Sequence, residues 1–149
     1  MAIARGAGTE IIRSAQFEYT ASNTTTQTLI LGEQHHIYTV LSIIIFAKAA
    51  STGMEVYIDG YDALEGTTTQ GIMLFNPGSM AINETYVWND KFSFNGHEPT
   101  DFVGPMEDAT KQNAIADQGS SSPNKLRMGK LANGDQFEVL VSYIDQNNA

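Results

Sequence analysis

The sequence has no cysteine and few positive charges, with 8 lysine and arginine residues against 17 aspartate and glutamate residues. Without cysteine, neither a disulfide framework nor a thiolate metal site can form. The formal net charge of −9 repels nucleic acid and anionic membrane surfaces, because no basic patch is present to attract them. The chain also lacks the apolar segment of a secretory signal, and its longest apolar run is too short to span a bilayer. We therefore expect neither a nucleic-acid partner nor a membrane partner.

Helical periodicity is nearly absent as well. Short β-branched and aromatic runs are separated by clusters of Gly, Asn, Asp and Thr, a pattern typical of strands joined by turns. The sequence predicts an all-β fold, a single antiparallel β-sandwich over residues 1–149, with the strand order left open between jelly-roll-like and immunoglobulin-like. The expected strands are Glu10–Arg13 or Phe17–Thr20, Thr25–Leu31, His36–Ala47, Met54–Tyr61, Gly71–Asn76, Ile82–Phe94, Asn124–Leu131 and Asp135–Asp145.

The run IYTVLSIIIFA at residues 37–47 is apolar on both of its alternating faces. A strand with one wet face alternates apolar with polar residues, so this strand needs a cover on each side. Strict alternation assigns the two faces to Ile37, Leu41, Ile43 and Ile45 on one side and Tyr38, Val40, Ile44 and Phe46 on the other. One cover is the core of the protein. The second is either another subunit or a loop of the same chain.

The C-terminal region carries the clearest turn signal. Asn133-Gly134 separates two apolar runs, and Asn-Gly favours a two-residue hairpin because both residues tolerate positive φ. The last strand then alternates regularly and directs one set of apolar side chains to a single face, namely Phe137, Val139, Val141 and Tyr143.

Two segments do not resemble core strands. Residues 1–16 contain Gly6 and Gly8 without a sustained period, which suggests an N-terminal arm. Residues 95–124 are polar and contain three of the four prolines, which suggests a long insert. Loops of this length in compact domains are usually functional or flexible. The insert is the loop that could fold back over the second apolar face of residues 37–47.

The histidines give no catalytic or metal signature. His35 and His36 are adjacent, so on a strand they point to opposite faces and cannot chelate one ion together. His97 stands alone in a polar segment. We expect no metal and no cofactor, and we predict that the protein is not an enzyme. A hydrolase with a dispersed site remains a minor alternative that requires a histidine near a carboxylate and a nucleophile.

Aromatic pairs offer a different possibility, a carbohydrate-binding adhesin module of a tail or surface fibre. Tyr86 and Trp88 share one face of a strand, and Tyr57 and Tyr61 share a face of another. If exposed, either pair would stack on sugar rings. The competing interpretation is that these rings fill the core or an intersubunit contact, where Tyr and Trp are enriched.

Four segments together resemble a known group of proteins. They are RGAGTEIIRS (5–14), QHHIYTVLSIIIFA (34–47), INETYVWNDKFSF (82–94) and DQFEVLVSYIDQ (135–146). The residue pattern of these strands and their order along the chain resemble those of small all-β virion structural proteins of tailed bacteriophages, especially those of marine and cyanobacterial hosts. The resemblance implies a capsid decoration or cement subunit, or a neck or tail-associated subunit, made in the host cytoplasm. It would work as a homo-oligomer, a trimer being one form, or with major capsid or tail proteins.

The first hypothesis is therefore a non-enzymatic structural protein of a phage virion that acts through protein–protein contacts. The adhesin module is the alternative. The acidic charge agrees with a position outside packaged DNA, because phosphates would repel an acidic lining. The residues that we expect at protein contacts are Arg5, Ile11, Ile12, Arg13, Tyr38, Phe46, Phe102 and Met106.

Overall fold

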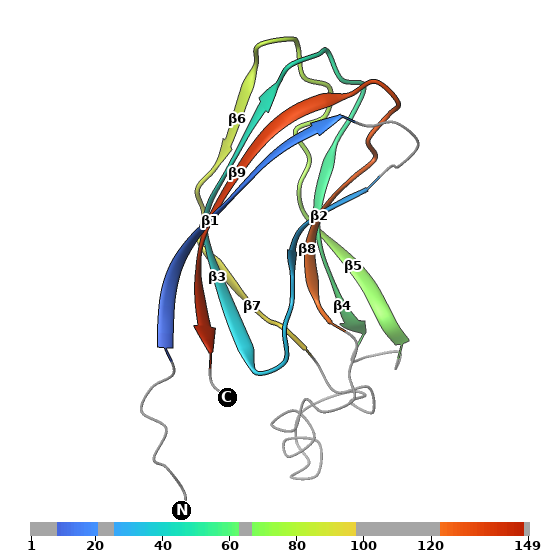
Figure 1. Ribbon diagram of the computed structural model, residues 1–149. Coiled ribbons are helices and arrows are strands. Elements are labelled where there is room, and N and C mark those ends of the chain that lie inside the picture. Colours follow the sequence, from blue (N-terminus) through green and yellow to red (C-terminus); the bar gives the residue numbers. More distant parts are fainter. Residues whose placement is uncertain (1–8, 21–25, 63–66, 98–122, 148–149) are drawn as a thin grey trace, which may run out of the picture.

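The computed structural model describes residues 9–20, 26–62, 67–97 and 123–147. Within these ranges nine strands form two antiparallel sheets that lie face to face (Figure 1). Sheet A contains β1 (Thr9–Thr20), β3 (His36–Ala47), β6 (Thr85–Trp88), β7 (Phe92–Asn95) and β9 (Gln136–Asn147). Sheet B contains β2 (Gln27–Leu31), β4 (Glu55–Asp62), β5 (Thr67–Phe75) and β8 (Lys125–Gly129). These ranges contain no helix, and the predicted all-β sandwich is confirmed.

The strand order decides between the two expected topologies. Sheet A runs β1-β9-β3-β6, with β7 also paired to β3, and sheet B runs β2-β8-β4-β5. The chain changes sheet at every connection except those from β4 to β5 and from β6 to β7. This is the double-sheet, Greek-key arrangement of a jelly roll. An immunoglobulin-like sandwich instead keeps its first two strands in one sheet.

The core lies between the sheets and draws on both of them. Phe137, Val139 and Val141 of β9 are buried there, as the alternation of the last strand predicts. Leu126 and Met128 of β8 supply the opposite layer and are fully buried. Each such side chain stabilises the fold by roughly 1.5–3 kcal/mol when it leaves water.

The expected faces of β3 are wrong in its first half. Tyr38 and Val40 point into the core together with Ile43 and Ile45, although strict alternation places them on opposite sides. The reason is a β-bulge: Val40 pairs with Tyr143 and Ser42 pairs with Ser142, so Leu41 is an extra residue on β3. A bulge adds one residue to one strand and thereby reverses the phase of everything beyond it.

The hairpin expected at Asn133-Gly134 is also wrong. The chain does turn there, and Gly134 has a φ of 93°. However, β8 lies in sheet B and β9 in sheet A, so the two strands do not pair. Residues 130–135 separate them, which is enough chain to cross between sheets about 10 Å apart. A two-residue type I′ turn needs positive φ at both central residues, and Asn133 does not have it.

The predicted N-terminal arm, residues 1–16, is wrong for its second half. Residues 9–16 belong to β1, which pairs with β9 along its whole length from Thr9 to Thr20. Residues 1–8 of the predicted arm lie outside the described residues. The missing period has a simple cause: β1 is an edge strand, and only its second half touches the core, through Ala15, Phe17 and Tyr19. The expected strand at residues 82–94 is likewise divided into β6 and β7, which pair with successive parts of β3.

The two roots of the predicted insert are joined at one end of the sandwich. His97 and Pro123 form a β-bridge. The Asn124 N–H donates to Gly96 O at 2.8 Å, and the Gly32 N–H donates to Asn124 O at 2.8 Å. The backbones approach so closely that a Cβ on Gly96 would overlap the carbonyl oxygen of Glu33. Residues 98–122 themselves lie outside the described chain.

Candidate functional site

The outer face of sheet A carries an apolar band across three strands. Ile44 on β3 lies opposite Leu140 on β9 and opposite Val87 on β6. Phe46 follows on the same face of β3. Ile44, Phe46 and Leu140 are half-buried, and Val87 is 54% exposed. The second apolar face predicted for residues 37–47 is therefore present only in the second half of β3, at Ile44 and Phe46. No described segment packs over it as a further layer (Figure 1).

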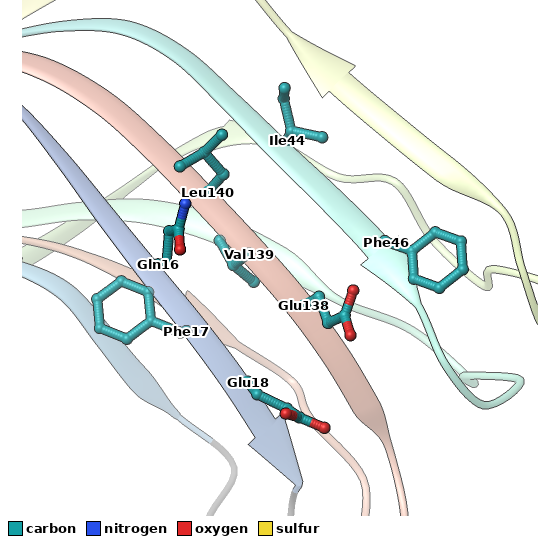
Figure 2. A pocket seen from close by; sticks show the side chains of 8 residues that line it. All are labelled: Gln16, Phe17, Glu18, Ile44, Phe46, Glu138, Val139 and Leu140. Atoms are coloured by element: carbon teal, nitrogen blue, oxygen red, sulfur yellow. The ribbon is translucent and has the colours of Figure 1, made fainter.

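A shallow hollow of about 440 Å³ lies on this face, and we call it the A-face groove. Figure 2 shows Ile44 and Phe46 of β3 beside Leu140 and Glu138 of β9. Glu18 of β1 lies in the lower part of this view, below Glu138. The complete lining is Gln16, Phe17, Glu18, Ile44, Phe46, Glu138, Val139 and Leu140. Its apolar floor and polar rim are the arrangement found at protein–protein contacts.

One end of the groove carries three charges. Glu18 and Glu138 are direct neighbours in the ladder between β1 and β9, an arrangement that is unfavourable for like charges. Lys48, one residue beyond β3, relieves it by an ion pair with Glu18 and by a 3.6 Å approach of its Nζ to Glu138 Oε1. The hydrogen bond and the charge of Lys48 lower the pKa of Glu18, and Glu18 in turn raises the pKa of Lys48. The groove thus ends in a net negative rim.

The outer face of sheet B differs because its charged side chains form ion pairs with one another. Arg127 of β8 forms an ion pair with the buried Asp59 of β4, and its guanidinium lies 4.7 Å from the centre of the Tyr57 ring. Lys130 forms an ion pair with the buried Glu55. Gly129 leaves the room for Tyr57, since a Cβ there would come within 2.7 Å of the ring. The central strands β4 and β8 of sheet B therefore present ion pairs on their outer face, and the exposed apolar residues of this sheet, Leu31, Ile72 and Met73, lie on its two edge strands.

The residues expected at protein contacts lie in different environments in the structure. Phe46 lines the A-face groove. Ile11 and Ile12 on β1 are exposed, and Ile12 is 75% exposed. Tyr38 is 3% exposed and lies in the core, because the bulge turns it inward, so it is not available to a partner. Arg5, Phe102 and Met106 lie outside the described residues.

Arg13 forms an ion pair with a carboxylate of its own chain. Its Nε lies 3.1 Å from Asp145 Oδ2, and His36 Nδ1 lies 2.6 Å from Asp145 Oδ1. The second ring nitrogen of His36 lies 3.4 Å from the Glu33 carboxylate. This arrangement supplies the histidine–carboxylate pair that a hydrolase needs, but both ring nitrogens face carboxylates, and among the described residues no hydroxyl nucleophile is hydrogen-bonded to either of them.

Tyr38 closes this cluster from the core side. The Glu33 backbone N–H donates to its hydroxyl at 3.0 Å. Burial raises the pKa of Tyr38 to about 12, and the nearby carboxylates of Asp145 and Glu33 act in the same direction. The cluster joins β1, β3 and β9 through side chains and is structural in its geometry.

The aromatic pairs do not form an open platform. Tyr86 and Trp88 share a face as predicted, but this face is directed at sheet B, where their rings stack on Phe75 at 5.2 and 4.7 Å. Tyr57 is covered by Arg127. The side chain of Tyr61 lies outside the described part. No observation on these residues favours sugar binding.

Of the eight residues that line the groove, the sequence pattern indicates only Ile44 and Phe46. Leu140, Glu138 and Glu18 come from strands whose outer faces look mixed in the sequence, and only their position beside β3 makes a site of them. The available signal was the pair Leu140 and Ile144 on the otherwise polar face of the last strand.

Within the described ranges, no group of three His, Asp or Glu side chains has the geometry to hold a metal ion. A separate search of the same ranges finds no helix of the length and apolarity that crossing a membrane requires.

No protein-family model matches the chain, and no curated protein matches it. Among solved structures, the chain is similar to one from Bacillus endospore appendages, described as disulfide-linked pili, at 12% identity and a TM-score of 0.45, with 100% of this chain and 97% of that chain covered. It is also similar to a chain of the infectious bursal disease virus Gx strain, at 9% identity and a TM-score of 0.40, with 99% of this chain and 35% of that chain covered. The chain thus spans about a third of that viral chain. TM-scores this low carry no functional argument, and the jelly-roll assignment rests on the strand order.

Proposed function

We propose that the protein is a non-enzymatic structural subunit of a phage virion that binds its neighbours through the outer face of sheet A. The neighbours are other copies of the chain, major capsid proteins or tail proteins. The location on the particle is the capsid exterior, neck or tail, as a decoration, cement, neck or tail-associated subunit. Synthesis takes place in the host cytoplasm.

The observation that carries the proposal is the A-face groove. It brings Ile44, Phe46 and Leu140 together on one open surface, whereas the central strands of sheet B, β4 and β8, cover their outer face with ion pairs. Burying a side chain of this size completely contributes roughly 1.5–3 kcal/mol. These three are already half-buried, so a partner would gain part of that amount from each.

The choice of a virion depends on the resemblance of four segments of the sequence to small phage structural proteins. The absence of cysteine means that contacts between copies of this chain would not be joined by disulfides.

The test places the same substitution at two sites. Ile44→Lys puts a charge on the floor of the A-face groove, whereas Ile82→Lys puts the same charge on an exposed position outside the sheets. We expect Ile44→Lys to reduce incorporation into purified phage particles by roughly tenfold or more, because the ammonium group must lose water at the contact. Ile82→Lys should incorporate as the unsubstituted protein does.

Thermal unfolding of both variants controls for folding. Normal incorporation of a folded Ile44→Lys protein would show that this face is not the contact. Absence of the unsubstituted protein from purified particles would reject the virion role itself.

A further inference from the structure

We propose that Asn133 is a site of spontaneous modification, at which the side-chain amide is converted to a carboxylate through a cyclic imide with Gly134. The dipeptide Asn-Gly occurs twice in the sequence, at residues 133–134 and at residues 95–96. The sequence therefore offers two equivalent sites, and the structure leaves only the first of them open to the reaction. The inference does not depend on the A-face groove as a contact or on the virion role.

The reaction needs only the chain itself and water. The backbone nitrogen of the glycine attacks Cγ of the asparagine, so that an N–Cγ bond forms and the Cγ–Nδ2 bond breaks. The amide group leaves with the proton of the glycine N–H as ammonia. Water then adds to one of the two carbonyl groups of the five-membered imide and opens the ring to aspartate or isoaspartate. Glycine favours the attack because it has no Cβ to obstruct ring closure, and the nitrogen must be free to approach Cγ in a suitable orientation.

The turn at Asn133-Gly134 meets these conditions. Both residues are exposed, and a Cβ on Gly134 would have no atom within 4 Å. Among the described residues, none forms a hydrogen bond with the Gly134 N–H or with the Asn133 side chain. The attacking nitrogen is therefore unbound, and the ring has room to close.

The same dipeptide at Asn95-Gly96 is held in a closed position. Asn95 is the last residue of β7 and pairs with Ile37 of β3. The Gly96 N–H donates to His36 O at 2.8 Å, and a Cβ on Gly96 would lie 1.9 Å from Glu33 O. Attack by this nitrogen first requires local opening of the sandwich, and the opening equilibrium lowers the rate of any reaction at a protected backbone group.

The ends of the reactive turn are fixed by bonds that the reaction leaves in place. The Asp135 N–H donates to Ala132 O at 3.1 Å, and the Ala132 N–H donates to Asp135 Oδ2 at 2.8 Å. Neither bond involves the Asn133 side chain. We therefore expect the modified protein to stay folded, so that the products accumulate.

The new carboxylate appears at the end of the sandwich that carries the acidic rim of the groove. The turn precedes Gln136, which pairs with Thr20 at the end of β1 and accepts the Lys48 backbone N–H at 2.8 Å (Figure 1). Glu18 and Glu138 form the next pair but one in the same ladder. Each conversion adds one negative charge to the formal −9, so this end of the molecule becomes more acidic as the protein ages.

The test compares the two sites within one molecule. The folded protein is incubated in mildly alkaline buffer, and peptide mapping by mass spectrometry measures conversion at each asparagine. Conversion at Asn133 should exceed that at Asn95 by roughly tenfold or more, because Asn95-Gly96 must first lose its backbone hydrogen bonds. In urea that unfolds the chain, the two sites should convert at similar rates, because the same dipeptide then reacts without structural constraint.

The variant Asn133→Gln is the matched control. Glutamine keeps the amide at this exposed position, but its longer side chain would have to close a less favoured six-membered ring. Ion exchange should resolve an acidic species that accumulates in the unsubstituted protein and not in Asn133→Gln. Equal conversion of both sites in the folded protein, conversion of Asn133 only in urea, or the same acidic species from Asn133→Gln would overturn the proposal.

Discussion

At the scale of single residues, Tyr38 is the side chain whose environment differs most from its expected one. The sequence places it beside Phe46 on an outer contact face, and the structure places it in the core. Its ring stacks on Phe94 at 5.3 Å, and its hydroxyl accepts the Glu33 backbone N–H. The same residue therefore anchors the turn before β3 instead of a partner.

This environment gives a prediction in alkaline solution. The folded state keeps the Tyr38 hydroxyl neutral because its pKa is raised from 10.0 to about 12. The stabilisation from this residue is fully present below pH 10 and is lost as the pH rises toward 12, since the unfolded chain ionises first. At neutral pH, Tyr38→Phe should lower the free energy of unfolding by about 1 kcal/mol, because the Glu33 N–H loses its acceptor.

Urea unfolding of both proteins from neutral pH to pH 12 measures the effect. The difference between the unsubstituted protein and Tyr38→Phe should shrink above pH 10. A constant difference across this range would mean that Tyr38 ionises equally in the folded and unfolded states.

At the scale of elements, the bulge at Leu41 allows both halves of β3 to direct apolar side chains into the core, while Ile44 and Phe46 stay on the outer face. Val40 and Ile43 both point inward although three positions separate them, because Leu41 is left out of the ladder with β9. Without the bulge, Tyr38 and Val40 could not share the inner face with Ile43 and Ile45, because strict alternation would place the two pairs on opposite sides of the sheet. The bulge also leaves Ile44 and Phe46 together on the outer face, where the groove forms.

Deletion of Leu41 should therefore leave a folded protein. The deletion joins Val40 to Ser42 and restores simple alternation, so each remaining side chain of β3 keeps its face. Deletion of Ile44, where the ladder is regular, should prevent folding because it turns Ile45 and Ala47 outward. Circular dichroism and cooperative thermal unfolding distinguish the two. Similar behaviour of the two deletions would contradict the assigned register.

At the scale of the whole molecule, the two ends of chain that flank residues 98–122 are held together by backbone contacts. His97 and Pro123 are bridged, and Asn124 ties the end of β7 to the turn after β2. The length of a segment that joins two fixed ends changes the closure entropy only slowly, by about 0.6 kcal/mol for each doubling.

Replacement of residues 98–122 by a short Gly-Ser turn should leave the free energy of unfolding within about 1 kcal/mol of its original value. Urea unfolding measures it. A loss of several kcal/mol would instead indicate that the insert covers part of the sandwich, the A-face groove included. The insert would then be the second cover that the sequence allows for residues 37–47.

The sequence by itself determined the class of the fold and the need for a second apolar contact. Alternation with a period of two is a local property, so it is visible in the last strand and in residues 37–47 without any partner strand. Which strands adjoin was not visible, because pairing in a jelly roll joins segments far apart in the chain. The turn at Asn133-Gly134 and the strand β1 show this directly: each was misjudged from neighbours in sequence. Only the tertiary structure decided that Leu140 and Glu18 lie in one groove with Ile44, because register and the order of neighbouring strands are properties of the assembled sheet.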